Sequence, residues 1–259
     1  MRSAFFAFVL VLGTSGLAAA QELPDWTEFQ NIPDGFKVAF PGQPKVTNTV
    51  WTTEYGYKAP AHVYSAERGR EKYSVTVADY NAIESQGVER RKGCPPGAEP
   101  CIGSDISGPG YWRHDIRGAM IFATKQYLQK NVTMTNYTWQ HQDLIEGAEL
   151  QLTSNADQSR TFVFIAMHEN KLYIFDGTVP KGYPQPGLFQ QSVGFVDKDG
   201  RGIRYQTMYS NEIYGLKERE TPTYGGGGGG GGARQGGGGG RQGGGGRQGG
   251  GGRLGGGQP

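Results

Sequence analysis

The stretch that decides the fold runs from Arg160 to Thr178 and reads RTFVFIAMHENKLYIFDGT. Apolar side chains occupy almost every position of its first half, on both alternating faces, which is typical of a strand covered on both sides. The pair Glu169–Asn170 interrupts the run, and Asn tolerates the positive φ that a tight hairpin needs. Leu172–Phe175 predicts a second apolar strand. A central hairpin covered on both faces predicts a layered domain of helices and strands rather than a bare two-sheet sandwich.

Further strands are predicted on both sides of this hairpin. Their segments alternate apolar and polar residues or are rich in β-branched residues, and Tyr73, Val75 and Val77 form one well-buried face. The predicted strands outside the hairpin are 36–40, 46–53, 61–66, 73–80, 132–139 and 148–153. The fold class that we expect is therefore α+β, an antiparallel sheet with helices on its faces.

One long helix is predicted in the middle of the chain, at Tyr111–Lys130. Its apolar residues recur at helical spacing and should face the sheet: Trp112, Ile116, Ala119, Ala123 and Tyr127. A short helix is expected near Ile83–Arg90. Gly187–Phe195 predicts a short closing helix with Leu188, Phe189 and Val193 turned inward. Residues 203–208 are expected to form a last strand or an extended arm.

The N-terminus has the features of a cleavable signal peptide at residues 1–20. Arg2 precedes an apolar run that is too short to span a bilayer, and Ala18 and Ala20 fit the positions before a cleavage site. We expect an exported chain that begins at Gln21 and resides in the periplasm, with the cell surface and the medium as alternatives. An extended lead-in is expected at 21–32, before a domain at 33–208.

The charge is divided unevenly along the chain. Arg2 and four tail arginines account for five of the 26 basic residues, and neither segment contains Asp or Glu. Residues 21–224 therefore hold 21 basic and 24 acidic residues, a net charge of −3. This balance gives no support to a specific nucleic-acid-binding face on the folded body. No later segment is long and apolar enough to predict a transmembrane helix.

The composition changes after a linker at 209–224. Residues 225–259 are mostly glycine and predict a disordered tail, because such a segment cannot bury apolar surface. Four arginines in this tail are candidate contacts for polyanions or anionic membrane surfaces: Arg234, Arg241, Arg247 and Arg253. An extension that only adds solubility remains the alternative interpretation.

The two cysteines, Cys94 and Cys101, occur in the segment GCPPGAEPC. In an exported protein, a close pair of this kind predicts a disulfide that closes a small loop. A redox pair usually has two intervening residues, and here there are six. The pair lies in an irregular stretch, 81–110, whose length is typical of functional loops.

The sequence offers few candidates for catalysis. It contains four histidines, and no pair of them has the spacing of a helical metal site: His62, His114, His141 and His168. A nucleophile elbow and a phosphate-binding glycine loop are also missing from the sequence. We assign no catalytic, cofactor-binding or metal residue, and expect no cofactor; whether the protein is an enzyme stays uncertain, with the balance against it.

Two motifs carry a resemblance to a known family. FKVAFPGQP at 36–44 and FQQSVGFV at 189–196, in this order of strands and helices, resemble the PsbP-like α-β-α sandwich family, which is named for an extrinsic photosystem II subunit and includes many exported bacterial relatives. The resemblance covers about residues 30–200. It implies a small periplasmic domain that binds or assists a larger assembly without catalysis, and we carry over no site residue from it.

These observations lead to one functional hypothesis and two alternatives. The first is an exported, non-catalytic binding or assembly factor of the bacterial envelope, whose partner is another envelope protein. The second is a periplasmic hydrolase with a site near the 81–110 loop. The third is an envelope protein that binds polyanions through its cationic tail. A pocket beside that loop with two or more titratable groups would favour the hydrolase.

Overall fold

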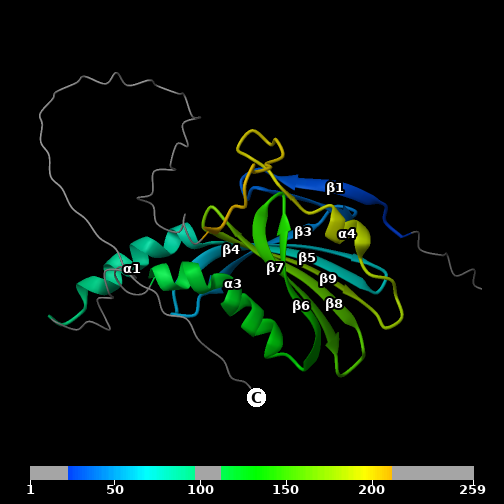
Figure 1. The fold of residues 1–259 in the computed structure, drawn as a ribbon, viewed down its shortest axis with the longest axis horizontal. Helices are drawn as coiled ribbons and strands as arrows, with labels where there is room; N and C mark the ends of the chain where they lie inside the picture. The colour runs from blue at the N-terminus through cyan, green and yellow to red at the C-terminus, as the bar shows by residue number, and fades with distance from the viewer. Residues whose placement is uncertain (1–22, 97–111, 212–259) are drawn as a thin grey trace, which may run out of the picture. The chain divides into compact units, whose positions relative to one another are not determined.

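A computed structural model describes residues 23–96 and 112–211, which form two antiparallel sheets and a few helices (Figure 1). The strands are β1 (Trp26–Asn31), β2 (Phe36–Pro41), β3 (Lys45–Thr52), β4 (Lys58–Arg68), β5 (Glu71–Asp79), β6 (Val132–Gln142), β7 (Ile145–Ser154), β8 (Arg160–His168), β9 (Lys171–Val179) and β10 (Gly194–Phe195). The helices are the 3₁₀ turn η1 (Tyr80–Ala82), α1 (Ile83–Lys92), α3 (Trp112–Leu128) and α4 (Gly187–Gln191). The predicted α+β class is confirmed.

The hairpin of β8 and β9 lies at the centre of the large sheet, whose order is β3-β4-β5-β9-β8-β7-β6. Its turn residues, Glu169 and Asn170, have φ values of 49° and 59°, as a tight hairpin requires. β9 pairs with β5 and β8 pairs with β7, so this hairpin joins the early strands of the sheet to the later ones. Each strand predicted outside the hairpin is present, with its ends shifted by at most three residues.

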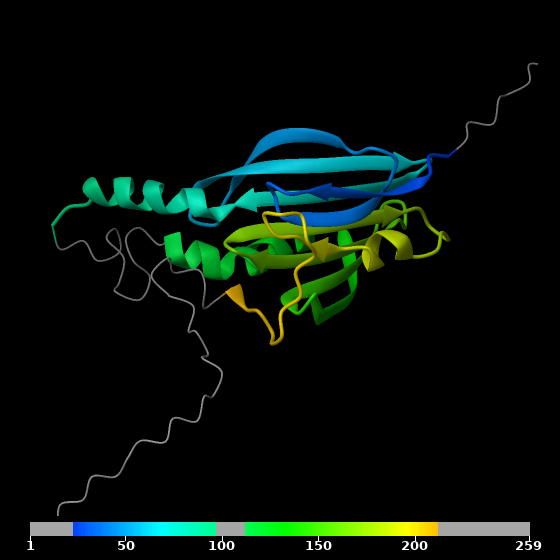
Figure 2. The ribbon, with the colours of Figure 1, turned by 90° about the horizontal axis from the view of Figure 1, so that it is seen from above.

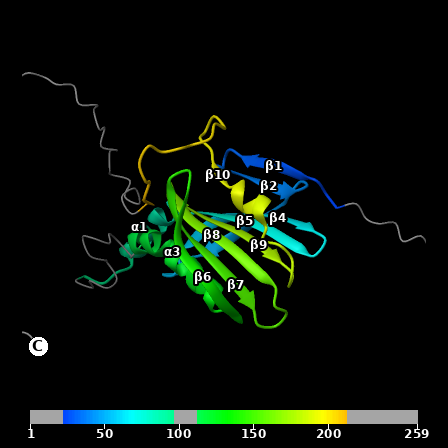
Figure 3. The ribbon, with the colours of Figure 1, turned by 45° about the vertical axis from the view of Figure 1, so that its right-hand side comes forward.

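One face of the large sheet is covered by α3, which confirms the long helix (Figure 3). The helix buries Trp112, Ile116, Ala119 and Ala123 against aliphatic side chains of β7, β8 and β9. The two alanines allow the helix backbone to approach the sheet closely. The short helix predicted near residue 83 is also present, as α1.

The opposite face is covered mainly by a second sheet of order β1-β2-β10, together with α4 (Figures 2 and 3). This face buries a cluster of aromatic residues that comes from both sheets, from α4 and from the segment after β10: Phe36, Phe40, Tyr64, Tyr73, Tyr173, Phe175, Phe189, Phe195 and Tyr209. The lead-in predicted at 21–32 contains β1, which pairs with β2 along its whole length. A three-stranded sheet and one turn of helix thus take the place of a full helical layer.

The closing segment differs from its prediction in two ways. The helix α4 ends at Gln191, and the chain then pairs with β2 as β10, because Gly194 and Phe195 continue the small sheet. Phe189 and Val193 are buried as predicted, but Leu188 is 60% exposed, since it lies on the outer side of a single helical turn. Residues 203–208 form an extended arm rather than a strand, and an isolated bridge joins Tyr209 to Ile145.

Several sequence predictions concern residues outside the described part of the chain. These are the signal peptide (1–20), most of the linker (212–224), the tail (225–259) and the end of the irregular loop (97–111), which contains Cys101. Within residues 23–96 and 112–211, no helix has the length and apolar character needed to cross a membrane.

Candidate ligand pocket

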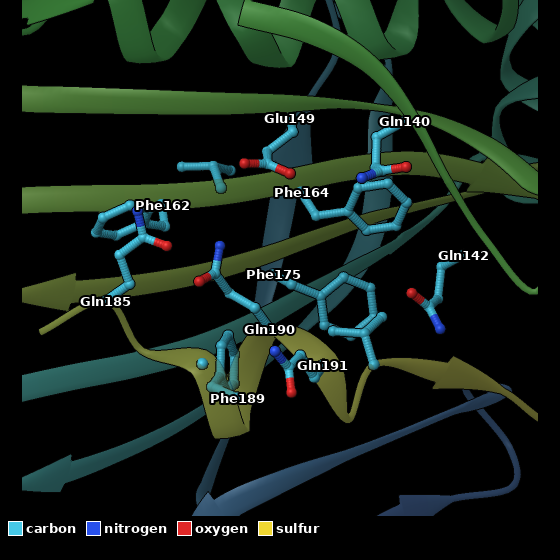
Figure 4. A pocket seen from close by; sticks show the side chains of 13 residues that line it. Gln140, Gln142, Glu149, Phe162, Phe164, Phe175, Gln185, Phe189, Gln190 and Gln191 are labelled. Carbon is cyan, nitrogen blue, oxygen red and sulfur yellow. The ribbon is translucent and has the colours of Figure 1, made fainter. Parts of the chain in front are cut away.

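A pocket of about 330 Å³ lies on the small-sheet face, between α4 and the surface of β6–β9 (Figure 4). Its lining combines aromatic rings with side-chain amides and a single carboxylate. The lining residues are Gln140, Gln142, Glu149, Phe162, Val163, Phe164, Phe175, Gln185, Gly187, Phe189, Gln190, Gln191 and Val193. Its volume is at the lower end of the range for small-molecule sites.

Two phenylalanine rings form the floor of the pocket. Phe164 on β8 and Phe175 on β9 are paired across the hairpin, with ring centroids 6.1 Å apart and an interplanar angle of 29°. Gly147 on β7 permits this arrangement, because a Cβ atom there would lie 2.5 Å from Cε2 of Phe164 and 2.6 Å from the carbonyl oxygen of Ile165. The glycine therefore sets the position of the Phe164 ring.

One wall of the pocket comes from β6 and β7. The strand β6 is an edge strand, and its residues Gln140 and Gln142 lie on the face that looks toward α4. Glu149 on β7 lies next to them and is directly opposite Phe164 in the register. The Gln151 amide donates a hydrogen bond of 3.0 Å to Oε1 of Glu149 and helps to hold this carboxylate in place.

The facing wall is α4, which is fixed by one buried ring and one hydroxyl. Phe189 is 1% exposed and packs against Phe40 and Tyr73, with centroid distances of 5.6 and 5.2 Å. The hydroxyl of Ser192 accepts a hydrogen bond from the backbone N–H of Ala39 at 2.7 Å and donates one to the carbonyl of Phe189 at 3.0 Å. These contacts tie α4 to β2.

With α4 held in this way, Gln185, Gln190 and Gln191 present their amides to the floor, across from Gln142 and Glu149 (Figure 4). The side chains of these four glutamines make no hydrogen bond to any residue in the described ranges. Each amide offers two donor hydrogens and an acceptor oxygen. The pocket therefore holds unused hydrogen-bonding capacity of both kinds above an apolar floor.

The chemistry of the lining favours binding over catalysis. Glu149 is the one titratable side chain among the lining residues, and none of the others is Ser, Thr, Cys, Lys or His. General acid–base catalysis usually needs a second titratable group, and covalent catalysis needs a nucleophile. With the described lining residues, the pocket can hold a ligand by hydrogen bonds and apolar contact.

None of the four histidines is among the described residues that line this pocket. His62 is bonded to the buried carboxylate of Asp34, with Nδ1 2.7 Å from Oδ2, and the Tyr64 hydroxyl donates to the same oxygen at 2.6 Å. Burial, followed by this contact with Asp34, raises the pKa of Tyr64. His62 and Asp34 line none of the described pockets, so we assign them to the anchoring of the 31–36 turn.

His168 is 2% exposed, and its Nε2 lies 2.8 Å from the Tyr205 hydroxyl in the arm. Burial, with a smaller effect from Lys171, lowers the pKa of His168 to about 4, so the ring is neutral at ordinary pH. It connects β8 to the arm. Across residues 23–96 and 112–211, no group of three or more His, Cys, Asp or Glu residues is arranged to hold a metal ion.

A second hollow, of about 600 Å³, lies on the α3 face near the β4–β5 turn and is lined by several charged residues, including Lys45, Glu67, Lys72 and Asp176. Asp176 accepts hydrogen bonds from the Tyr127 hydroxyl at 2.7 Å and from Thr178 Oγ1 at 3.1 Å. Burial raises the pKa of Asp176. Because this carboxylate fastens the end of α3 to β9, we assign it a structural role.

Of the predicted site residues, only Cys94 lies in the described part of the chain, and it does not line the pocket. Cys94 follows α1, and its Sγ lies 3.7 Å from the carbonyl oxygen of Arg90, but Cys101 lies outside the described residues, so the disulfide stays a prediction. The four tail arginines also lie outside them. The pocket glutamines were missed because FQQSVGFV was interpreted only as a fold motif, although it contains Gln190 and Gln191. The available signal was that glutamines recur in two short segments, QHQ at 140–142 and QQ at 190–191.

Comparison with known proteins found similarity among solved structures. No protein-family model matches the sequence, and no curated protein matches it. Among solved structures, the chain is similar to the solution structure of cyanobacterial PsbP (CyanoP) from Synechocystis sp. PCC 6803, with 13% sequence identity and a TM-score of 0.37. The match covers 71% of this chain and 98% of that chain. That protein is a PsbP, and the motifs at 36–44 and 189–196 resemble the family that is named for PsbP.

Proposed function

We propose that this protein is an exported, non-catalytic binding module of the bacterial periplasm or envelope, and that it holds an uncharged polar ligand in the pocket between α4 and β6–β9. The observation that carries the proposal is the set of four glutamine side chains that make no hydrogen bond to any described residue, arranged around a phenylalanine floor. A site with this composition gains most from a ligand that has both donors and acceptors and an apolar surface.

The composition of the pocket also separates this proposal from the hydrolase alternative. Among the described residues that line it, Glu149 is the one titratable group, and its walls come from β6, β7 and α4. The polyanion alternative rests on the tail arginines alone, because this pocket contains no basic residue. The envelope partner that we expect would either bind this protein together with its ligand or deliver the ligand to this protein.

The experiment is a ligand screen with the mature full-length chain and two variants. The chain is mixed with neutral, anionic and cationic metabolites, short peptides and saccharides, and binding is followed by thermal shift and by calorimetry. The test variant is the double substitution Gln142→Ala and Gln190→Ala. The control is Gln129→Ala, which changes an exposed glutamine that lines none of the described pockets.

We expect a ligand that is bound by the parent chain and the control, is weakened at least tenfold by the double variant, and is recovered with unchanged mass. Both variants should keep the parent melting temperature, because the substituted amides make no hydrogen bond to described residues. Recovery of a cleaved ligand would support the hydrolase instead. Binding that the double variant leaves unchanged would exclude the pocket.

A further inference from the structure

We propose that the ligand of this pocket is a neutral saccharide, with one sugar ring lying on Phe164 and its hydroxyl groups held by the surrounding amides and by Glu149. This inference rests on the proposed function and adds the chemical class of the ligand. A sugar ring has two kinds of surface, an edge of hydroxyl groups and an apolar face of C–H groups. The pocket has the same two kinds, a rim of amides and a floor of aromatic rings (Figure 4).

The charge of the lining selects against anionic ligands. The residues that line the pocket include one carboxylate and no Lys, Arg or His. A phosphate, a carboxylate or an acidic polysaccharide would meet Glu149 without a compensating cation, and like charges at short range are unfavourable. A cation could pair with Glu149, and the cationic metabolites of the ligand screen test that case. A neutral ligand meets no like charge here, and its hydrogen bonds to the amides offset the loss of its hydration.

The amides favour a ligand with many hydroxyl groups. Each hydroxyl can donate and accept, and so can each glutamine amide, so neighbouring hydroxyls of a sugar match the two ends of one amide. Gln142, Gln185, Gln190 and Gln191 are arranged on different sides of the floor and can reach different hydroxyls (Figure 4). Glu149, already oriented by Gln151, adds an acceptor for a charge-assisted hydrogen bond.

An uncharged peptide is the rival ligand, because it also carries donors and acceptors. Peptides are commonly bound by the addition of a strand to an open sheet edge, where backbone groups are available. This pocket lies on the face of the large sheet and presents side-chain amides above β8 and β9. A volume of about 330 Å³ suits roughly one or two sugar rings.

The floor supports the same conclusion. Phe164 is held against β7 by the absence of a side chain at Gly147, and it stacks on Phe175 from the neighbouring strand. A rigid ring in the centre of a polar rim provides a fixed apolar platform, and aromatic platforms of this kind gain affinity at low entropic cost. We assign Phe164 as the stacking residue and Gln190 and Glu149 as the residues that orient the sugar.

The test uses the mature full-length chain with neutral oligosaccharides built from glucose, galactose or N-acetylglucosamine. An oligogalacturonate and a capped, uncharged tripeptide complete the panel of probes. Binding is measured by calorimetry and by saturation-transfer NMR, each at low and at high NaCl concentration. The variants are Glu149→Gln, Gln190→Ala and Phe164→Leu, with Gln129→Ala as the control.

At least one neutral saccharide should bind, with an affinity that does not change with salt, because no ion pair is formed. Its C–H protons should receive saturation from aromatic protons. Gln190→Ala and Glu149→Gln should each weaken binding by about three- to tenfold, as expected for the loss of one hydrogen bond. Phe164→Leu keeps an apolar side chain at the floor and should reduce the saturation transfer, while Gln129→Ala should have no effect.

Two results would overturn the saccharide assignment in different ways. If the tripeptide binds and the same variants weaken it while no saccharide binds, the pocket is a binding site and only the ligand class is wrong. If no probe from this panel or from the broader screen binds, the proposed function falls as well. Saccharide binding that the pocket variants leave unchanged would place the saccharide elsewhere on the protein.

Discussion

The two faces of the large sheet are covered in different ways, and only one of them leaves a pocket that suits a ligand. The α3 face is covered by one helix of 17 residues, about 25 Å long, over a mainly aliphatic core. The opposite face carries aromatic rings under the small sheet and α4, a helix of five residues. Five residues extend over about 7.5 Å, whereas four neighbouring strands extend over about 14 Å.

The uncovered remainder of that face becomes the pocket. The helix α4 is too short to reach across β6–β9, and most side chains of the edge strand β6 are exposed. The comparison shows that a pocket can form where a layer is incomplete. The following predictions test whether the two faces differ in this way.

The largest effect should come from Phe189→Ala, on the small-sheet face. Phe189 is 1% exposed and is the main apolar anchor of α4. Its removal should lower the free energy of unfolding by about 3–5 kcal/mol, in line with buried Phe to Ala substitutions elsewhere. Chemical denaturation gives the change, and ligand binding should be lost together with the position of α4. A loss below 1 kcal/mol would mean that α4 is held by other contacts.

The second prediction concerns pH and the same face. Burial lowers the pKa of His168 to about 4 in the folded protein, whereas its ordinary value is 6.5. As pH falls, the unfolded chain binds this proton first, so the stabilising contribution is complete above about pH 6.5 and is lost toward about pH 4, by at most about 3 kcal/mol. The substitution His168→Gln should remove this contribution to the dependence of the free energy of unfolding on pH.

The measurement is the free energy of unfolding of the parent protein and of the His168→Gln variant at several pH values between 4 and 7. The acidic side chains titrate in both chains, so the difference between the two curves isolates the histidine. A constant difference across this window would show that the buried ring titrates at its ordinary pKa.

A smaller loss is expected on the α3 face from Asp115→Ala. This carboxylate is 2% exposed, accepts a hydrogen bond from the Thr53 hydroxyl, and accepts another from the backbone N–H of Tyr55 at 3.1 Å. Burial raises the pKa of Asp115, and the two hydrogen bonds oppose part of this effect while they fix the position of the carboxylate. Its removal should cost about 2 kcal/mol, because the buried Thr53 hydroxyl loses the acceptor for its proton and keeps only the bond that it accepts from the Tyr57 N–H.

Asp115→Asn is the matched control, since it keeps an acceptor oxygen and should lose less. Calorimetry of the same variants should show ligand affinity equal to that of the parent chain, because α3 covers the face opposite to the pocket. A change in affinity would show that the two faces of the sheet are energetically coupled, which would contradict their independence.

The smallest effect should come from Leu188→Gln. The sequence pattern predicted that this leucine faces inward, but it is 60% exposed, next to the buried Phe189. The free energy of unfolding should change by less than about 0.5 kcal/mol, as for most surface substitutions. A loss of 2 kcal/mol or more in a denaturation experiment would show that Leu188 is covered in solution.

Much of the fold was predictable because it depends on local patterns. The hairpin of β8 and β9, the helix α3 and the strands predicted outside the hairpin have periodicities that a single sequence displays. The inward position of Leu188 was wrong, since a helix of one turn has too few residues to define a face. The small sheet was missed as a layer because β1 pairs with β2 through backbone groups, and its register is not visible in side-chain type.

The sequence by itself determined the class of the domain, its central hairpin and the uneven distribution of charge, because these follow from the order and type of neighbouring residues. The pocket was decided by tertiary structure alone. Its residues come from β6, β7, β8, β9 and α4, which are separated by up to about fifty positions in the chain. Glutamine carries no charge and little periodic signal, so these amides acquire a role only when the sheet and α4 bring them together around Phe164.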